Sequence, residues 1–165
     1  MEHLYAPWRD TYFKEKRDGC VFCHISASPE QDRELGVLHR DEDCFVVMNR
    51  YPYTPGHIMV IPHQHTDKLE ELPEAVWQHM AQRAQQGLKL LKAALHAPAL
   101  NLGMNIGAEA GAGIAEHLHL HVLPRWQRDT NFITTVGGAR VFSTDFEVIY
   151  ETLLARADEF FKGES

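Results

Sequence analysis

The chain has 165 residues, 44% of them hydrophobic and 24% charged, which suits one globular domain with its own core. Its net charge of −7 argues against a nucleic-acid polymer as partner, because duplex binding normally relies on a basic surface. The apolar runs are too short to span a bilayer, and the N-terminus lacks the layout of a signal peptide. We therefore expect no membrane association and a cytoplasmic protein.

The domain organisation is expected to be simple, because no internal repeat or long linker divides the chain. We treat residues 1–165 as a single domain with an N-terminal segment over 1–33, a core over 34–132 and a C-terminal helix over 143–163. The N-terminal segment mixes proline, glycine, charged and aromatic residues, which predicts irregular structure with a short helix around residues 12–16.

Three strands are expected next, over residues 36–40, 44–49 and 57–62. The last two are rich in valine, isoleucine and methionine and are bounded by turn residues. Between them, Pro52 and Pro55 are incompatible with both a helix and strand pairing. Residues 51–56 are therefore predicted to form the turn of a hairpin.

A long amphipathic helix is expected after the hairpin. Thr66 and Asp67 offer N-caps, Pro73 suits a first helical turn, and apolar residues recur every three or four positions from Val76 to Leu95. Two more strands are expected over residues 100–106 and 117–123.

The C-terminal helix is expected to begin at a capping box, Thr144 with Glu147, and to end at Gly163. Strands, a helix, further strands and a final helix predict an α+β fold with a mainly antiparallel sheet.

Three histidines alternate with apolar residues in the last strand, at His117, His119 and His121. In a strand their rings share one face, roughly 6.6 Å apart, while the residues between them enter the core. Neutral imidazole can form a covalent bond to phosphorus, and a protonated neighbour can stabilise negative charge. The pattern favours a phosphate site. The alternatives are a half-exposed strand whose outer residues happen to be histidine, or an adventitious metal patch.

A glycine-rich stretch, residues 107–113, leads into this strand. Its main-chain N–H groups could form a nest for phosphate oxygens, although glycine turns often only connect strands. It is not a P-loop, because the Gly-Lys-Ser/Thr ending is missing and a strand follows it.

Residues 117–123 match the His-φ-His-φ-His-φ-φ signature of the histidine triad superfamily, and Pro124 and Arg125 continue it. Residues 49–62 resemble the family's nucleoside-binding hairpin, so the resemblance covers roughly residues 20–132. Residues 125–126 and 129–132 are similar to the diadenosine polyphosphate phosphorylase or hydrolase branch. The resemblance implies a five-stranded mainly antiparallel sheet with a long central helix and a C-terminal helix, and a homodimer.

The resemblance also implies an activity: nucleotidyl transfer from a dinucleoside polyphosphate such as diadenosine tetraphosphate, with phosphate or water as acceptor. No cofactor is then required for the chemistry. His119 is the implied nucleophile, His121 and His57 contact the phosphoryl oxygens, and His117 supports the site from behind. A nucleoside phosphoramidase and a slow nucleotide-binding module remain the alternatives.

Nucleotide-binding residues are implied in the same way. Asn49 would hold the ribose and Asn105 would lie beside the α-phosphate, although both residues also suit a turn or a strand end. Trp126 either stacks on a purine or covers the edge of the core. The loop before the triad would contribute Gly111, Gly113 and Ile114.

This loop departs from the family pattern, because residues 111–116 contain none of the Ser, Thr or Gln that relatives commonly carry. The proton source for the leaving group is therefore His57, His121 or water.

A structural zinc site is the last expectation. Cys20 and Cys23 form a Cys-x-x-Cys pair, and an odd number of cysteines without a secretion signal argues against disulfides. Many relatives bind zinc here, and the resemblance implies His65 and His117 as the other ligands. Two unligated thiols are the alternative. A redox pair fits less well, because no strand-to-helix context is expected around it.

Overall fold

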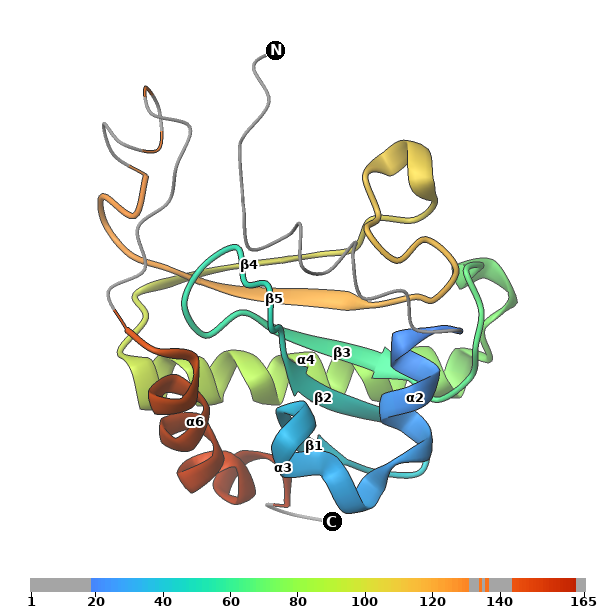
Figure 1. The fold of residues 1–165 in the computed structure, drawn as a ribbon, viewed down its shortest axis with the longest axis horizontal. Helices are drawn as coiled ribbons and strands as arrows, with labels where there is room; N and C mark the ends of the chain where they lie inside the picture. The colour runs from blue at the N-terminus through green and yellow to red at the C-terminus, as the bar shows by residue number, and fades with distance from the viewer. Residues whose placement is uncertain (1–18, 131–133, 135, 137–143, 163–165) are drawn as a thin grey trace.

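The structure is a computed structural model that describes residues 19–130, 134, 136 and 144–162. Its centre is a five-stranded antiparallel sheet of order β1-β2-β3-β5-β4 (Figure 1). The strands are β1 (Val37–Arg40), β2 (Cys44–Met48), β3 (Ile58–Pro62), β4 (Ala99–Gly103) and β5 (Leu120–Arg125). The predicted α+β fold and the β2–β3 hairpin are thus confirmed.

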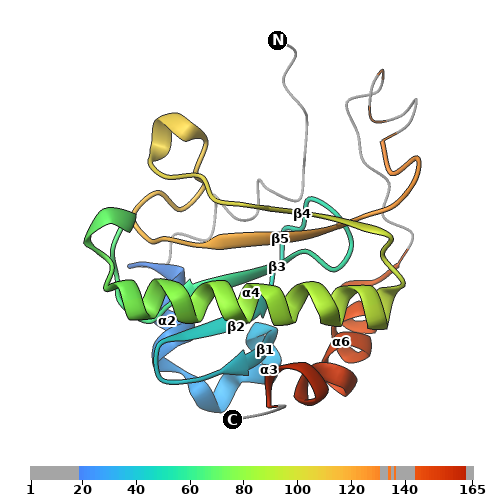
Figure 2. The same cartoon turned by 180° about the vertical axis from the view of Figure 1, so that it is seen from behind.

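Helices cover both faces of the sheet. They are α2 (Val21–Ala27), α3 (Asp32–Leu35), α4 (Glu74–Leu95) and α6 (Phe146–Phe161). Helix α4 runs along one face beside α6, whereas α2 lies on the opposite face (Figures 1 and 2). Among the helices of the described residues, none combines the length and the hydropathy that a membrane span requires.

The two faces of the sheet belong to different apolar clusters, because side chains alternate along a strand. Leu120 and Val122 of β5 pack into the cluster that contains residues of α4 and α6. His121 lies between them in sequence and opposite Met59 of β3, which belongs to the cluster on the α2 side. The histidines of the triad therefore open toward α2.

Two strand boundaries differ from the prediction by three residues each. Strand β5 begins at Leu120 rather than at 117, because the Leu118 N–H donates to the Thr66 carbonyl at 2.8 Å instead of to a sheet neighbour. Strand β4 ends at Gly103 rather than at 106, before the turn that Gly107 makes with a φ of 86°. The first two histidines of the triad thus lie in the loop that leads into β5.

The predicted helix starts were also partly wrong. Pro73, not Thr66 or Asp67, is the N-cap of α4, and a short 3-10 turn (Leu69–Glu71) fills the gap. Helix α6 begins after Asp145 rather than Thr144, because the Asp145 carboxylate accepts from the Glu147 N–H at 3.2 Å. The expected end at Gly163 lies outside the described residues.

The N-terminal segment was predicted to be irregular, but the residues after 18 form α2, a 3-10 turn (Pro29–Gln31) and α3. Phe22 and Ile25 bury one side of α2 against the sheet. The short helix expected around residues 12–16 lies outside the described residues.

Gly56 is essential to the turn that places His57. Its φ is +77°, and a Cβ atom there would lie 2.4 Å from Leu95 Cδ1. We expect Gly56→Ala to lower the free energy of unfolding by about 2–4 kcal/mol, through strain and overpacking, as measured by urea unfolding. Gly113→Ala is the matched control, because its φ is not in the left-handed region and its Cβ would meet nothing within 4 Å. Equal stability of the two variants would contradict this account of the turn.

Candidate active site and metal centre

A cavity of about 930 Å³ opens on the α2 side of the sheet. Both His119 and His121 line it, and their ring centroids lie 4.8 Å apart. His119 lines the cavity although it lies in the loop before β5. Both side chains are more than nine-tenths buried, so they face the cavity rather than open solvent.

His57 lies behind His121 and fixes its tautomer. The Tyr53 N–H and the Asn49 side-chain amide both lie 3.2 Å from His57 Nδ1, which must therefore be an acceptor. Because one nitrogen of a neutral imidazole carries the proton, that proton is on His57 Nε2, which donates to His121 Nδ1 at 2.9 Å. His121 then carries its own proton on Nε2.

This Nε2–H group of His121 is a buried donor without a hydrogen-bond partner among the described residues. Buried donors are normally satisfied, and leaving one unpaired costs about 1–3 kcal/mol. A phosphoryl oxygen in the cavity would satisfy it. We call this hydrogen-bonded pair, His57 and His121, the histidine relay. The relay prepares His121 to bind an anion.

His119 has the opposite arrangement of donor and acceptor. Its Nδ1 lies 2.8 Å from the His117 carbonyl, which can only accept, so Nδ1 carries the proton. The lone pair is then on Nε2, where a nucleophile needs it. Burial lowers the pKa of His119, which keeps the ring neutral at pH 7.

Burial has a larger effect on the other two rings. It lowers the pKa of His57 to about 3, helped by the neighbouring His121 and His119. It lowers the pKa of His121 to about 4, with His119 as the second cause. At neutral pH the whole relay is uncharged.

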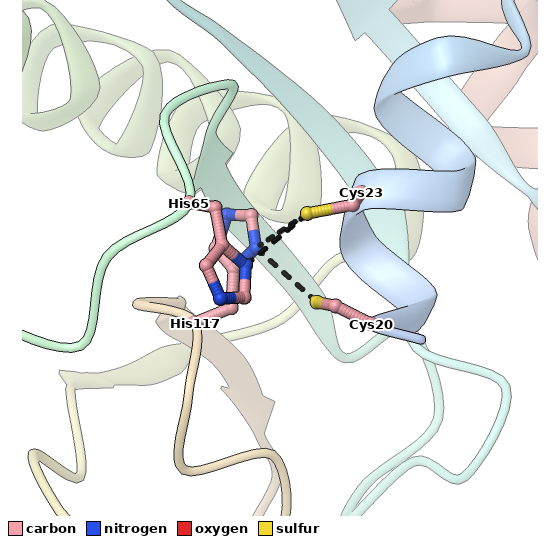
Figure 3. A group of neighbouring side chains, drawn as sticks. All are labelled: Cys20, Cys23, His65 and His117. Carbon is pink, nitrogen blue, oxygen red and sulfur yellow. Dashed lines mark hydrogen bonds between the residues drawn. The ribbon is translucent and has the colours of Figure 1, made fainter. Parts of the chain in front are cut away.

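Four potential metal ligands gather beside this site: Cys20, Cys23, His65 and His117 (Figure 3). Their donor atoms all lie within 4.8 Å of one another. Cys20 Sγ is 3.3 Å from His117 Nδ1, and Cys23 Sγ is 3.2 Å from His65 Nδ1. Two thiolates and two imidazoles at such separations fit a closed tetrahedral zinc site. The ligands come from the start of α2, the loop after β3 and the loop before β5.

His117 joins the group of potential metal ligands to His119. Its Nε2–H donates to the Pro62 carbonyl at 2.9 Å, which leaves Nδ1 to face the cysteines. Its carbonyl in turn holds His119 Nδ1. A metal bound here would fix the main chain that sets the tautomer of His119.

Comparison with known proteins agrees with this geometry. The family model described as "HIT domain" matches residues 30–128. The chain belongs to the HIT family. It is 37% identical over 153 residues to "AP-4-A phosphorylase" of Mycobacterium tuberculosis, a match that covers 86% of this chain and 76% of the relative. The predicted resemblance to the histidine triad family is thus confirmed.

Solved HIT structures share the fold. A Zn-bound histidine triad family protein from Mycobacterium smegmatis matches with a TM-score of 0.71 and 30% identity, over 88% of this chain and 98% of the other. A protein from Sulfolobus tokodaii, described as a "hypothetical histidine triad nucleotide-binding protein", matches with a TM-score of 0.67 and 28% identity, over 85% and 93% of the two chains.

The other residues implied by the HIT resemblance separate into two groups. Asn49, Gly113 and Ile114 line the cavity. Asn49 Oδ1 accepts from the Tyr51 N–H at 2.9 Å, which fixes the amide beside His57. The cavity wall, as the described residues form it, does not include Asn105, Gly111 or Trp126.

One expected contact of the HIT site needs correction. His57 was expected to touch the phosphoryl oxygens, but its side chain is fully buried and both of its nitrogens have protein partners. Its contact with the rings that line the cavity is the hydrogen bond to His121. The reason is the β3–β5 pairing, which places His121 on the cavity side of His57.

Sequence reasoning missed much of the apolar end of the cavity. Phe22, Ile25 and Leu35 of the N-terminal helices line it together with Val47 and Met48 of β2. The spacing of Phe22 and Ile25 suits a buried helical side and was the available signal. Tyr53 and Glu116 also line the cavity and were not singled out.

The neutral relay predicts a pH effect on stability. Unfolding restores an ordinary pKa near 6.5 to His57 and His121, so below that pH the unfolded chain binds more protons. Their contribution is complete above pH 6.5 and is lost as the pH falls toward their folded values of about 3 and 4. Each histidine can contribute a slope of up to about 1.4 kcal/mol per pH unit.

Urea unfolding between pH 7 and pH 4.5 measures this slope. We expect the free energy of unfolding of His57→Gln to fall less steeply with pH than that of the wild type, because the variant lacks one histidine that binds a proton on unfolding. His96→Asn is the control, since His96 is exposed and in the left-handed conformation that Asn tolerates. Identical slopes for His57→Gln and the wild type would refute the neutral relay.

Proposed function

We propose that the chain is a nucleotidyl transferase or hydrolase that cleaves dinucleoside polyphosphates such as diadenosine tetraphosphate. The observation that carries this proposal is the pair of rings in the cavity, a lone pair on His119 Nε2 beside an unpaired N–H on His121. Membership of the HIT family and the name of the M. tuberculosis relative support a nucleotide-processing enzyme.

In the first step His119 Nε2 attacks the α-phosphorus, and the bond from phosphorus to the bridging oxygen breaks. The products are an adenylyl group on His119 and ATP as the leaving group. The His121 N–H donates a hydrogen bond to the bridging oxygen, where negative charge develops. The His117 carbonyl, 2.8 Å from Nδ1, stabilises the positive charge on the adenylylated ring.

In the second step an acceptor displaces His119 from phosphorus. Inorganic phosphate gives ADP, and water gives AMP. A polyphosphate leaves as an anion and phosphate attacks as an anion, so neither needs full proton transfer from the uncharged relay. Water must lose a proton when it attacks. The low pKa of His121 makes it a weak base for that proton, which favours phosphate over water as acceptor.

The same reasoning ranks the alternative HIT activity. A phosphoramidase expels an amine, which must be protonated to leave, and the low pKa of His121 makes the relay a poor proton source for it. Slow turnover of an adenylated amine beside rapid turnover of diadenosine tetraphosphate is the expected result.

The test of function is incubation with diadenosine tetraphosphate, with and without inorganic phosphate, followed by separation of the nucleotides. We expect ADP and ATP with phosphate, and slower release of AMP and ATP without it. Faster cleavage of an adenylated amine would favour the phosphoramidase. Absence of both turnover and adduct would make the chain a nucleotide-binding module and contradict the proposal.

We also propose a structural zinc ion at Cys20, Cys23, His65 and His117. The donor set supports it. When bound, the ion would link α2 to the loops after β3 and before β5. The bonds to phosphorus are made and broken by the chain's own imidazoles in this proposal, and the metal has no part in them.

The assembly that we propose is a homodimer formed through β4. This strand is at the edge of the sheet, and four of its five residues are exposed, with Leu102 at 54%. An exposed edge of this kind can pair with a second copy and extend the sheet. Light scattering should give twice the mass of one chain. If the wild type has the mass of one chain, and Leu102→Lys has the same mass, this assembly is contradicted.

A further inference from the structure

Tyr53 is held firmly against the histidine relay, yet its ring is partly exposed. Its main-chain N–H donates to His57, and its ring stacks on His57 at 4.9 Å with an interplanar angle of 29°. The same ring lies 5.7 Å from that of His121. Tyr53 lines the cavity, and 37% of its surface is exposed. Pro52 and Pro55 restrict the turn that carries it.

The reaction geometry gives this ring a position relative to the leaving group. Displacement at phosphorus is in line, so the leaving group departs on the side opposite His119. The ring of His121, the proposed donor to the bridging oxygen, lies 4.8 Å from that of His119 and 5.7 Å from that of Tyr53, and all three side chains line the cavity. A leaving group that departs from His119 past His121 within this cavity comes within reach of Tyr53.

We propose that Tyr53 is a specificity-determining residue that stacks on the base of the departing nucleotide. An aromatic ring on a rigid turn can bind a base at little entropic cost, and its π-face accepts any base. Through this contact the enzyme selects dinucleotides over nucleotides with a single nucleoside. The inference rests on the proposed function and deepens it by naming the feature of the substrate that is recognised.

The test compares two substrates that differ in the second nucleoside, diadenosine tetraphosphate and adenosine 5′-tetraphosphate. Attack of His119 on the α-phosphorus of the latter expels triphosphate, with no base to stack. We expect Tyr53→Leu to lower kcat/KM for the dinucleotide about tenfold, which corresponds to about 1.4 kcal/mol of stacking. For adenosine 5′-tetraphosphate the change should be under about twofold, and Tyr53→Phe should resemble the wild type on both substrates.

Two results would overturn the inference. An equal loss on both substrates would mean that Tyr53 acts through His57 or on the transferred nucleoside. No loss on either would mean that the ring has no role in selection.

A parallel binding measurement separates this inference from the proposed function. The measurement uses titration calorimetry with the same two nucleotides in chains that carry His119→Asn. Adding Tyr53→Leu to these chains should weaken the binding of the dinucleotide and leave the binding of adenosine 5′-tetraphosphate unchanged. If the wild type fails to turn over either nucleotide, the proposed function falls, while the calorimetry still decides whether Tyr53 recognises a second base.

Discussion

Replacing His119 by Asn is expected to lower kcat/KM for diadenosine tetraphosphate at least about 10⁴-fold, the scale of losing a covalent nucleophile. The Asn amide can still donate to the His117 carbonyl, which accepts from His119 Nδ1 in the wild type. What disappears is the lone pair at Nε2. Steady-state kinetics with saturating phosphate, together with urea unfolding to confirm the fold, measure this effect.

The matched control is His96→Asn, the same chemical change at an exposed residue that ends α4. It should retain turnover within about twofold, because surface substitutions rarely cost more than about 0.5 kcal/mol. Turnover in His119→Asn close to that of the control would show that another group attacks phosphorus.

Loss of the proposed zinc ion is expected to have the largest effect on stability. We expect about one zinc ion per chain by elemental analysis, and a fall in Tm of roughly 10 °C or more in Cys20→Ser/Cys23→Ser. The reason is that several kcal/mol of metal binding energy contributes to folding, at about 2–4 °C per kcal/mol for a chain of this size. Chelation should have the same effect on the wild type, and added zinc should reverse it.

The control for the metal centre is His24→Ala. His24 is an exposed imidazole on α2, next in sequence to Cys23 but outside the group of potential ligands. It should keep both the zinc and the Tm. A double-cysteine variant that unfolds at the wild-type temperature would contradict a structural metal.

Much of the site could be predicted from sequence, because its signals are local. Alternation in residues 117–123 places His119 and His121 together, and both do line one cavity. Glycine and two prolines define the turn before His57. The proposed set of zinc ligands also depends on fixed spacing, and its four side chains do gather.

What sequence did not reveal depends on contacts between distant segments. The burial of His57 behind His121 follows from the pairing of Ile58 with Val122 and of Met59 with His121, a register that no local pattern specifies. The Leu118 N–H donates to the carbonyl of Thr66, which is distant in sequence, and this hydrogen bond delays the start of β5 to Leu120. Asp145 displaces Thr144 as N-cap, although both residue types suit that position.

In the proposed reaction His119 becomes covalently adenylylated. Rapid acid-free quenching of the enzyme with diadenosine tetraphosphate in phosphate-free buffer, followed by peptide mass spectrometry, tests it most directly. We expect one adenylyl group per site, on the peptide that contains residue 119, and its disappearance when inorganic phosphate is added. Steady turnover without any adduct, or an adduct on a different residue, would contradict it.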